Sequence, residues 1–173
     1  MDIRDDGCDI EKCTTGGAWS TENKWTVWYH SVKDNNWTKE SYEKIFTMSN
    51  LGDYEILKKS VKKIHLQNCM LFIMKGDILP IWEDPENIDG CSLSFKITSK
   101  DIVKDWNDII LNIITSDIFL KDSRNINGLS ISPKKEFNIV KIWTKNKIQK
   151  YSDIYTEYGK NYSERNVIIK SHK

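Results

Sequence analysis

The sequence predicts an α+β fold in which an antiparallel sheet of about seven to eight strands is backed by three helices on one face. Short segments that alternate apolar and polar residues, such as 25–30 and 92–97, indicate strands. Stretches at 53–64, 99–119 and 148–158 place apolar residues three and four positions apart, as helices with one buried face do. We expect the helices to cover one side of the sheet and to leave the other side concave and open to water.

The first half of the chain is predicted to begin with strands at 25–30 and 42–48, joined by a polar loop that carries Trp37. A helix follows, with Asp53 as its N-cap and lysines on its outer face. The run 69–74 is apolar throughout, which is typical of a strand that is covered on both faces.

The second half is predicted to alternate strands and helices in a similar way. In order, we expect a strand, a helix, two strands, a helix and a last strand, at 92–97, 99–119, 129–132, 137–143, 148–158 and 167–170. No internal repeat divides the chain. We therefore expect a mobile N-terminal tail at 1–18, where no period appears, and a single domain at 19–173.

Size and charge narrow the classes of function. The 173 residues are about one domain's worth, and such a domain buries roughly 70% of its unfolded surface without a metal or disulfide. The formal net charge of +1 creates no general attraction to nucleic acid or membrane, so any contact with nucleic acid must be local. No apolar run approaches the length of a membrane span.

The cysteines and histidines predict no metal site. Cys8, Cys13, Cys69 and Cys91 form no pair with zinc-ligand spacing, and the three histidines are scattered. We interpret the cysteines as free thiols in a reducing compartment, and we expect a soluble, cytoplasmic protein. Because no glycine-rich phosphate loop and no nucleophile–base motif occur, we expect neither a cofactor nor enzymatic activity.

Three tryptophans are candidates for a binding site. Trp82 and Glu83 stand side by side just after Pro80, Trp37 lies among polar neighbours, and Trp143 ends a strand. A tryptophan is more often a core residue, and an acid beside one is more often a solvated turn residue. Two flat rings can nevertheless enclose a nucleobase, and a neighbouring carboxylate can accept hydrogen bonds from its N–H edge. Together these residues predict the binding of a methylated guanine cap.

The order of the tryptophans resembles a known family. The pattern runs from 23–29 through Trp37, 80–84 and the helical Trp106 to Trp143, and it closely resembles translation initiation factor 4E. The resemblance implies a curved antiparallel sheet with three helices on its convex face. It also implies binding of the 7-methylguanosine cap of mRNA in translation initiation.

The resemblance assigns a role to each residue of the pattern. Trp37 and Trp82 would sandwich the base, and Trp143 would contact the 7-methyl group. Glu83 would accept from guanine N1–H and the 2-amino group, while the backbone N–H of Trp82 would donate to O6. Methylation leaves the base cationic, which adds roughly 0.5–2 kcal/mol per indole face to about 1–3 kcal/mol of stacking. Micromolar affinity needs about 8 kcal/mol net, so the sandwich and the glutamate are needed together.

The resemblance is weaker at the residues that would bind the phosphates of the cap. The first of the family's two basic residues corresponds to Lys134, but the second corresponds to Ile139, which cannot pair with a phosphate. Strand alternation places Lys141 on the same face as Trp143. Our hypothesis is that Lys134 and Lys141 hold the phosphates, with Lys135 as an auxiliary. The alternative is that Lys141 is an ordinary solvated strand residue.

The family's surface for peptides of initiation factor 4G also differs here. The tryptophan that the family carries on its first helix corresponds to Glu55 or, with a slip of one residue, to Tyr54. Asn107 replaces a leucine, and Trp19 offers another ring. The chain ends soon after His172, so we expect the family's later C-terminal loop to be missing.

These differences leave several functions open. The expected partners are capped mRNA and a divergent scaffold similar to initiation factor 4G, with no membrane. The alternative in the same family is a regulator that sequesters caps without recruiting the usual scaffold. A nucleotide hydrolase and an aromatic-cage reader of methylated lysine are less well supported, since the sequence lacks catalytic motifs and favours two flat plates over a cage.

Overall fold

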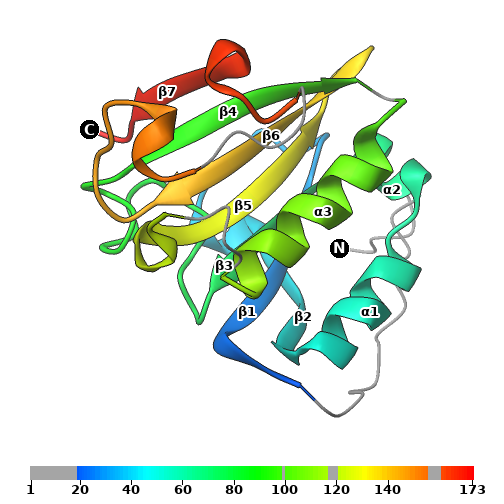
Figure 1. The fold of residues 1–173 in the computed structure, drawn as a ribbon. Coiled ribbons are helices and arrows are strands. Elements are labelled where there is room, and N and C mark those ends of the chain that lie inside the picture. The colour runs from blue at the N-terminus through cyan, green and yellow to red at the C-terminus, as the bar shows by residue number, and fades with distance from the viewer. Residues whose placement is uncertain (1–18, 99, 117–120, 156–160) are drawn as a thin grey trace.

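The computed structural model describes residues 19–98, 100–116, 121–155 and 161–173. Seven strands form one antiparallel sheet in the order β2-β1-β3-β5-β6-β4-β7 (Figure 1). Their bounds are β1 (Ser20–Ser31), β2 (Glu43–Asn50), β3 (Cys69–Lys75), β4 (Cys91–Thr98), β5 (Ile126–Pro133), β6 (Phe137–Thr144) and β7 (Val167–Ser171). The predicted tail at 1–18 lies outside the described residues.

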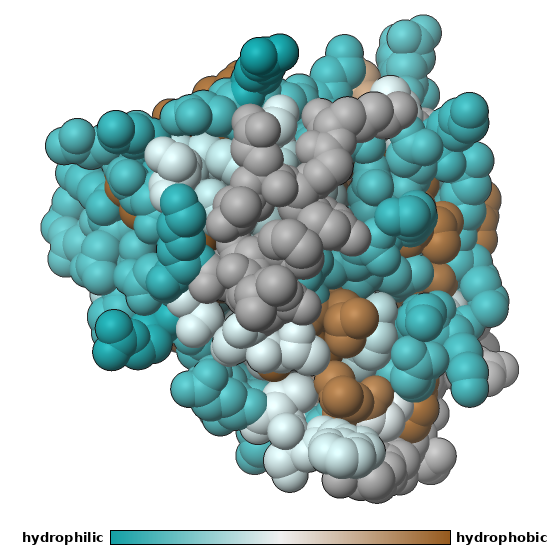
Figure 2. All heavy atoms as spheres, in the orientation of Figure 1, coloured by the Kyte–Doolittle hydropathy of each residue, from teal (hydrophilic) through white to brown (hydrophobic). Residues whose placement is uncertain are grey.

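Three α-helices lie on one side of this sheet (Figure 1), and the predicted α+β class is confirmed. They are α1 (Leu51–Ser60), α2 (Lys63–Asn68) and α3 (Ile102–Ile114). The α3 helix packs against β1, β4 and β5, and it buries Trp106 and a row of isoleucines. Figure 2 shows that mostly hydrophilic residues cover the visible outside of this helical side.

Strand alternation divides the apolar residues between the two faces of the sheet. Leu71, Leu129 and Ile142 belong to the large core beneath the helices. Phe72 and Trp143 belong instead to a smaller cluster on the opposite face. We call that opposite side the open face. Because β3 carries apolar residues on both sides, its continuous apolar run follows from its central position in the sheet.

The first helix is capped differently from the prediction. Asn50 is the N-cap, and its side-chain oxygen accepts from the backbone N–H of Asp53 at 2.9 Å. Asp53 lies in the first turn, where its carboxylate accepts from the backbone N–H of Ser49 at 2.8 Å. Both residues have side chains that suit an N-cap, and the sequence pattern pointed to the wrong one.

The same helix also ends earlier than predicted. The backbone of Val61 is extended, and a separate helix, α2, begins at Lys63. Ile64 therefore leaves the apolar stripe of α1 and is 54% exposed. The apolar residues keep helical spacing across the extended backbone at Val61, so spacing alone could not locate the end of α1.

The predicted helix at 148–158 is wrong in its described part. That part contains a single 3-10 turn, Tyr151–Asp153. The carboxylate of Asp153 accepts from the backbone N–H groups of Gln149 and Lys150, at 3.3 and 3.1 Å, which closes the turn. The buried rings of Tyr151 and Tyr155 produced the helix-like spacing, although they pack without a helix. Tyr158 lies outside the described residues.

The prediction that all four cysteines are free thiols is also wrong. Cys69 is disulfide-bonded, while Cys91 is free and buried. Spacing along the sequence could not have shown this, because it says nothing about which residues meet in space.

Candidate functional site

A pocket of about 400 Å³ opens on the open face of the sheet. Its volume lies in the usual range for small-molecule sites. The floor comes from side chains that alternation directs away from the helices, and the walls come from two loops. The lining residues are Trp37, Tyr42, Met70, Phe72, Pro80, Ile81, Trp82, Glu83, Ser130, Ser132, Lys134, Lys141 and Trp143.

Trp37 forms one wall from the Trp37 loop, which comprises residues 32–42 between β1 and β2. The indole is 53% exposed and stacks on His30, with ring centroids 4.3 Å apart and an interplanar angle of 2°. His30 is buried, and its two ring nitrogens each lie 2.8 Å from a backbone oxygen, of Ser31 and Asn36. Since one face of Trp37 is covered by His30, the opposite face is the one available to a ligand.

Trp82 lines the pocket from the Trp82 loop, which comprises residues 76–90 between β3 and β4. The Asp84 carboxylate accepts from the backbone N–H groups of Leu79 and Glu86, each at 2.9 Å. The fully buried Asn87 donates to the backbone oxygens of Leu79 and Ile81, also at 2.9 Å each. These bonds hold the loop in a fixed shape directly beside the indole.

A second set of contacts ties the Trp82 loop to distant parts of the chain. Asn127 on β5 donates to the side-chain oxygen of Asn87 at 3.0 Å. His172, just after β7, lies with Nδ1 2.7 Å from the backbone oxygen of Asn87 and stacks on Trp82 at a centroid distance of 5.8 Å. Burial and the nearby Lys141 hold the pKa of His172 below its usual value, although the bond to Asn87 opposes this.

Glu83 brings the only carboxylate among the described residues that line the pocket, and its side chain is exposed. Tyr42 lies close enough to Glu83 for the negative charge of the carboxylate to affect the pKa of the phenol. Burial and the negative charge of Glu83 raise the pKa of Tyr42 to about 12, so the phenol stays neutral and can donate a hydrogen bond. The pocket therefore offers one acidic acceptor beside two aromatic walls.

Trp143 lies at the floor of the pocket rather than in a wall. It is 3% exposed, and its Nε1–H donates to Ser130 Oγ at 3.0 Å. It meets Phe72 edge to face, with centroids 6.4 Å apart. Because the hydrogen bond satisfies the indole N–H, Trp143 is fixed with its ring bordering the cavity.

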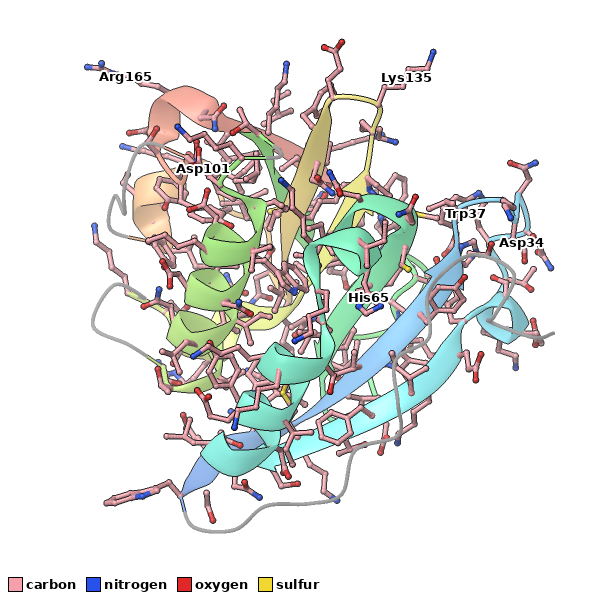
Figure 3. All side chains as sticks on the ribbon, turned by 90° about the vertical axis from the view of Figure 1, so that its right-hand side faces the viewer. Asp34, Trp37, His65, Asp101, Lys135 and Arg165 are labelled. Carbon is pink, nitrogen blue, oxygen red and sulfur yellow. The ribbon has the colours of Figure 1, made fainter. Side chains whose placement is uncertain are left out.

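The predicted phosphate-binding lysines do not all reach the pocket. Lys134 and Lys141 line it, whereas Lys135 does not. Figure 3 shows Lys135 at the tip of the hairpin between β5 and β6, directed outward. Burial holds the pKa of Lys141 below its usual value, and the positive charges of Lys170 and Lys134 lower it further.

The residues predicted for a partner surface lie on the helical side of the molecule. Tyr54 is 4% exposed and donates from its hydroxyl to the backbone oxygen of Asn107 at 3.1 Å, which joins α1 to α3. Glu55 faces solvent and pairs with Lys58 at 3.1 Å. Trp19 is 75% exposed. Glu55, rather than Tyr54, is thus the residue that this helix presents outward.

Sequence reasoning missed His30, His172 and Lys170. Alternation could have placed His30 on the same face as Trp28, and Lys170 on the side of β7 away from the core. Their contacts with Trp37 and Trp82 depend on how strands meet, which no local pattern gives. Among the described residues, no cluster of three or more potential metal ligands occurs.

Comparisons with known proteins identify the family of the chain. The model of a family described as "Eukaryotic initiation factor 4E" matches residues 20–169. The eukaryotic translation initiation factor 4E-1 of Caenorhabditis elegans is 25% identical over 138 residues, which cover 76% of this chain and 65% of that protein. The Saccharomyces cerevisiae factor 4E is 27% identical over 129 residues, covering 70% and 60%. The chain thus spans less than two thirds of these relatives' lengths.

Solved structures share the fold. A schistosome eIF4E, crystallised with m7GpppG and 4E-BP, superposes with a TM-score of 0.67 at 23% identity, over 76% of this chain and 74% of that one. An Ascaris suum eIF4E-3 with m7G cap gives 0.63 at 16% identity, over 76% of each chain. Within the described residues, no helix has the length and apolar character needed to cross a membrane.

Proposed function

Because this chain belongs to the eukaryotic initiation factor 4E family, we propose that it binds the 7-methylguanosine cap of mRNA and acts in translation initiation in the cytoplasm. One observation carries the proposal. Two tryptophans from separate loops, Trp37 and Trp82, line one pocket together with the carboxylate of Glu83. A flat cationic base with an N–H edge is the ligand that suits these three groups.

The base would lie between the two indoles. Each indole is already backed by a histidine, His30 behind Trp37 and His172 against Trp82. Rings that are held in place lose less conformational freedom when the ligand binds, so more of the stacking energy remains as affinity. The 7-methyl group leaves a positive charge on the base, and the faces of both indoles attract it.

Guanine would be selected by its hydrogen-bonding edge. The carboxylate of Glu83 can accept from N1–H and from the 2-amino group, and the backbone N–H of Trp82 can donate to O6. Adenine has neither the N1–H nor the 2-amino group, so it would leave the carboxylate unpaired. Trp143 at the floor would contact the methyl group. Each of these roles is that of a binding residue, and the proposed function includes no catalytic step.

Retention on immobilised 7-methyl-GTP tests the proposal. We expect the wild-type chain to be retained and to elute with free 7-methyl-GTP but not with free GTP at the same concentration. A Glu83→Ala variant should lose most of its preference for guanine over adenine analogues. Passage of the wild-type chain through the resin without retention would contradict cap binding.

A regulatory role is the second candidate, and the surface of α1 favours it. Glu55 is exposed and paired with Lys58 at the position where the family places a tryptophan that docks scaffold peptides. A peptide helix of the Tyr-x-x-x-x-Leu type would lose an aromatic contact there and would have to desolvate a charge. The protein would then sequester caps without recruiting the usual scaffold.

Peptide binding separates the two roles. We expect a Tyr-x-x-x-x-Leu peptide to bind more weakly than micromolar, and Glu55→Trp to strengthen binding by about tenfold through regained burial. Submicromolar binding by the unaltered chain would favour the initiation role over the regulatory one.

A further inference from the structure

Two lysines lie on either side of β4 on the open face of the sheet. Ser94 of β4 is the cross-strand partner of Lys141 on β6, and Ser92 is the cross-strand partner of Lys170 on β7. Their neighbours Leu93 and Ile169 turn toward the core beneath the helices, so the serines and lysines share the open face. The short serine side chains separate the two long basic ones.

Both ammonium groups also lie near the same aromatic wall. Lys170 Nζ is 4.9 Å from the ring centroid of Trp82, and Lys141 Nζ is 5.9 Å from it. Cationic groups at such distances are attracted by the indole face. The ring thus gathers two positive charges at the β7 side of the pocket, with Lys134 as a third on the pocket rim.

Within the part of the chain that the structure describes, these three ammonium groups have no anionic partner. None of the ion pairs among the described residues involves Lys134, Lys141 or Lys170, whereas nearby Lys145 and Lys173 pair with Glu86 and Asp89. The pKa of Lys141 is lowered by burial and by its two positive neighbours. Like charges that are gathered and left unpaired repel one another, and a bound anion would relieve that repulsion.

The ring of His172, which stacks on Trp82, is fixed in one tautomer. Its Nδ1 lies 2.7 Å from the carbonyl oxygen of Asn87, and a carbonyl only accepts, so Nδ1 carries the proton. Nε2 is then an acceptor, and it is buried without a hydrogen-bond partner in the described structure. Because an acceptor cannot pair with a phosphate oxygen, Nε2 takes no part in holding an anion, and the lysines alone do so.

We propose that Lys170 and Lys141 bind the phosphate chain of the cap across Ser92 and Ser94, so that the chain leaves the pocket toward β7. Ile139 on β6 cannot provide a positive charge. Lys170 provides it instead from β7, the strand on the other side of β4. This inference rests on the proposed cap function. Two strand spacings of about 4.8 Å separate β6 from β7, so the two lysines contact different phosphates of one chain.

A series of ligands with increasing numbers of phosphates tests this site. Affinities of 7-methylguanosine and of its mono-, di- and triphosphate are measured by tryptophan fluorescence for wild type, Lys170→Met and Lys59→Met. Lys59 is the matched control, since it is an exposed lysine on α1. We expect Lys170→Met to weaken the triphosphate by about tenfold, as the loss of a charged hydrogen bond would, and to leave the nucleoside within about twofold.

The salt dependence gives a second readout. One lost phosphate contact should lower the slope of log affinity against log salt by about 0.7–0.9 in Lys170→Met, with Lys170→Arg close to wild type. If Lys170→Met still binds the methylated nucleoside and keeps the wild-type triphosphate affinity and salt slope, this inference is overturned while the proposed function stands. Failure of wild type to bind the methylated nucleoside would overturn the proposed function, and this inference with it.

Discussion

The two indole walls of the pocket are held in different ways. The Trp82 loop is tied by Asn87 and Asn127 to β5 and to the segment after β7, so contacts from distant parts of the chain fix it. The Trp37 loop is held mainly by bonds between close neighbours, such as Asp34 to the N–H of Asn36 at 2.8 Å, and by the stack on His30. One wall is part of the fold, and the other can move without unfolding it.

This difference bears on how the pocket would close. A wall that is fixed by the fold gives a ligand a ready surface, whereas a locally held wall can adjust when the ligand arrives. We therefore expect changes to the supports of Trp82 to alter the stability of the whole domain. Changes to the supports of Trp37 should alter binding alone.

The largest expected effect follows from Asn87→Ala. The substitution leaves the carbonyls of Leu79 and Ile81 without their buried donor, at about 1–3 kcal/mol for each unsatisfied group. We expect the free energy of unfolding, measured with urea, to fall by about 2–4 kcal/mol, and cap affinity to fall with it. A change below about 0.5 kcal/mol would mean that the loop does not depend on the fold.

The two indoles themselves give the next effect. Trp82→Ala and Trp37→Ala should each weaken cap binding by about 1–3 kcal/mol, measured by calorimetry, because each removes one stacking face. Trp37→Ala should leave the unfolding midpoint nearly unchanged, since the ring is 53% exposed. Wild-type affinity in both variants would show that the base binds elsewhere.

A smaller effect is expected from Asp34→Ala. The loss of its bond to Asn36 should loosen the Trp37 loop and weaken cap binding by about 0.5–1.5 kcal/mol, the usual net value of one hydrogen bond. The unfolding free energy should stay within about 0.5 kcal/mol of wild type. Equal losses in stability and affinity would remove the distinction between the two loops.

The smallest effect concerns pH and His172. Its pKa in the folded state lies below the ordinary 6.5 because of burial and Lys141, so the unfolded chain takes up a proton more readily. Stability should therefore fall as the pH drops below about 6.5 and should be independent of this group above it. Urea unfolding at pH 7.5 and 5.5 should show a smaller difference in His172→Gln than in wild type. If the stability difference between the two pH values is the same in His172→Gln and in wild type, the pH dependence comes from other groups.

Local patterns predicted most of the sheet and much of the pocket. Alternation located β1 and β4, which have one face on the large core, and a continuous apolar run located β3, which is covered on both faces. Six of the predicted site residues line the pocket, and one of them, Lys134, was predicted only from the resemblance to the factor 4E family. They are Trp37, Trp82, Glu83, Trp143, Lys134 and Lys141.

Features that depend on contacts between distant residues were missed. The tyrosines at 151 and 155 have helical spacing but pack into the core around a short turn. His172 reaches Trp82 because β7 pairs with β4, and the last strand gives no sign of this by itself. The disulfide at Cys69 and the position of Lys170 near the Trp82 ring were missed for the same reason.

Titration of the wild-type chain with 7-methyl-GDP and with GDP tests most directly whether two tryptophans enclose a methylated base. Tryptophan fluorescence follows both titrations under the same buffer and salt. We expect 7-methyl-GDP to quench the fluorescence and to bind at least about tenfold more tightly than GDP, because only the methylated base carries a positive charge between the indoles. Equal affinity for the two nucleotides, or no quenching by either, would contradict the sandwich of Trp37 and Trp82.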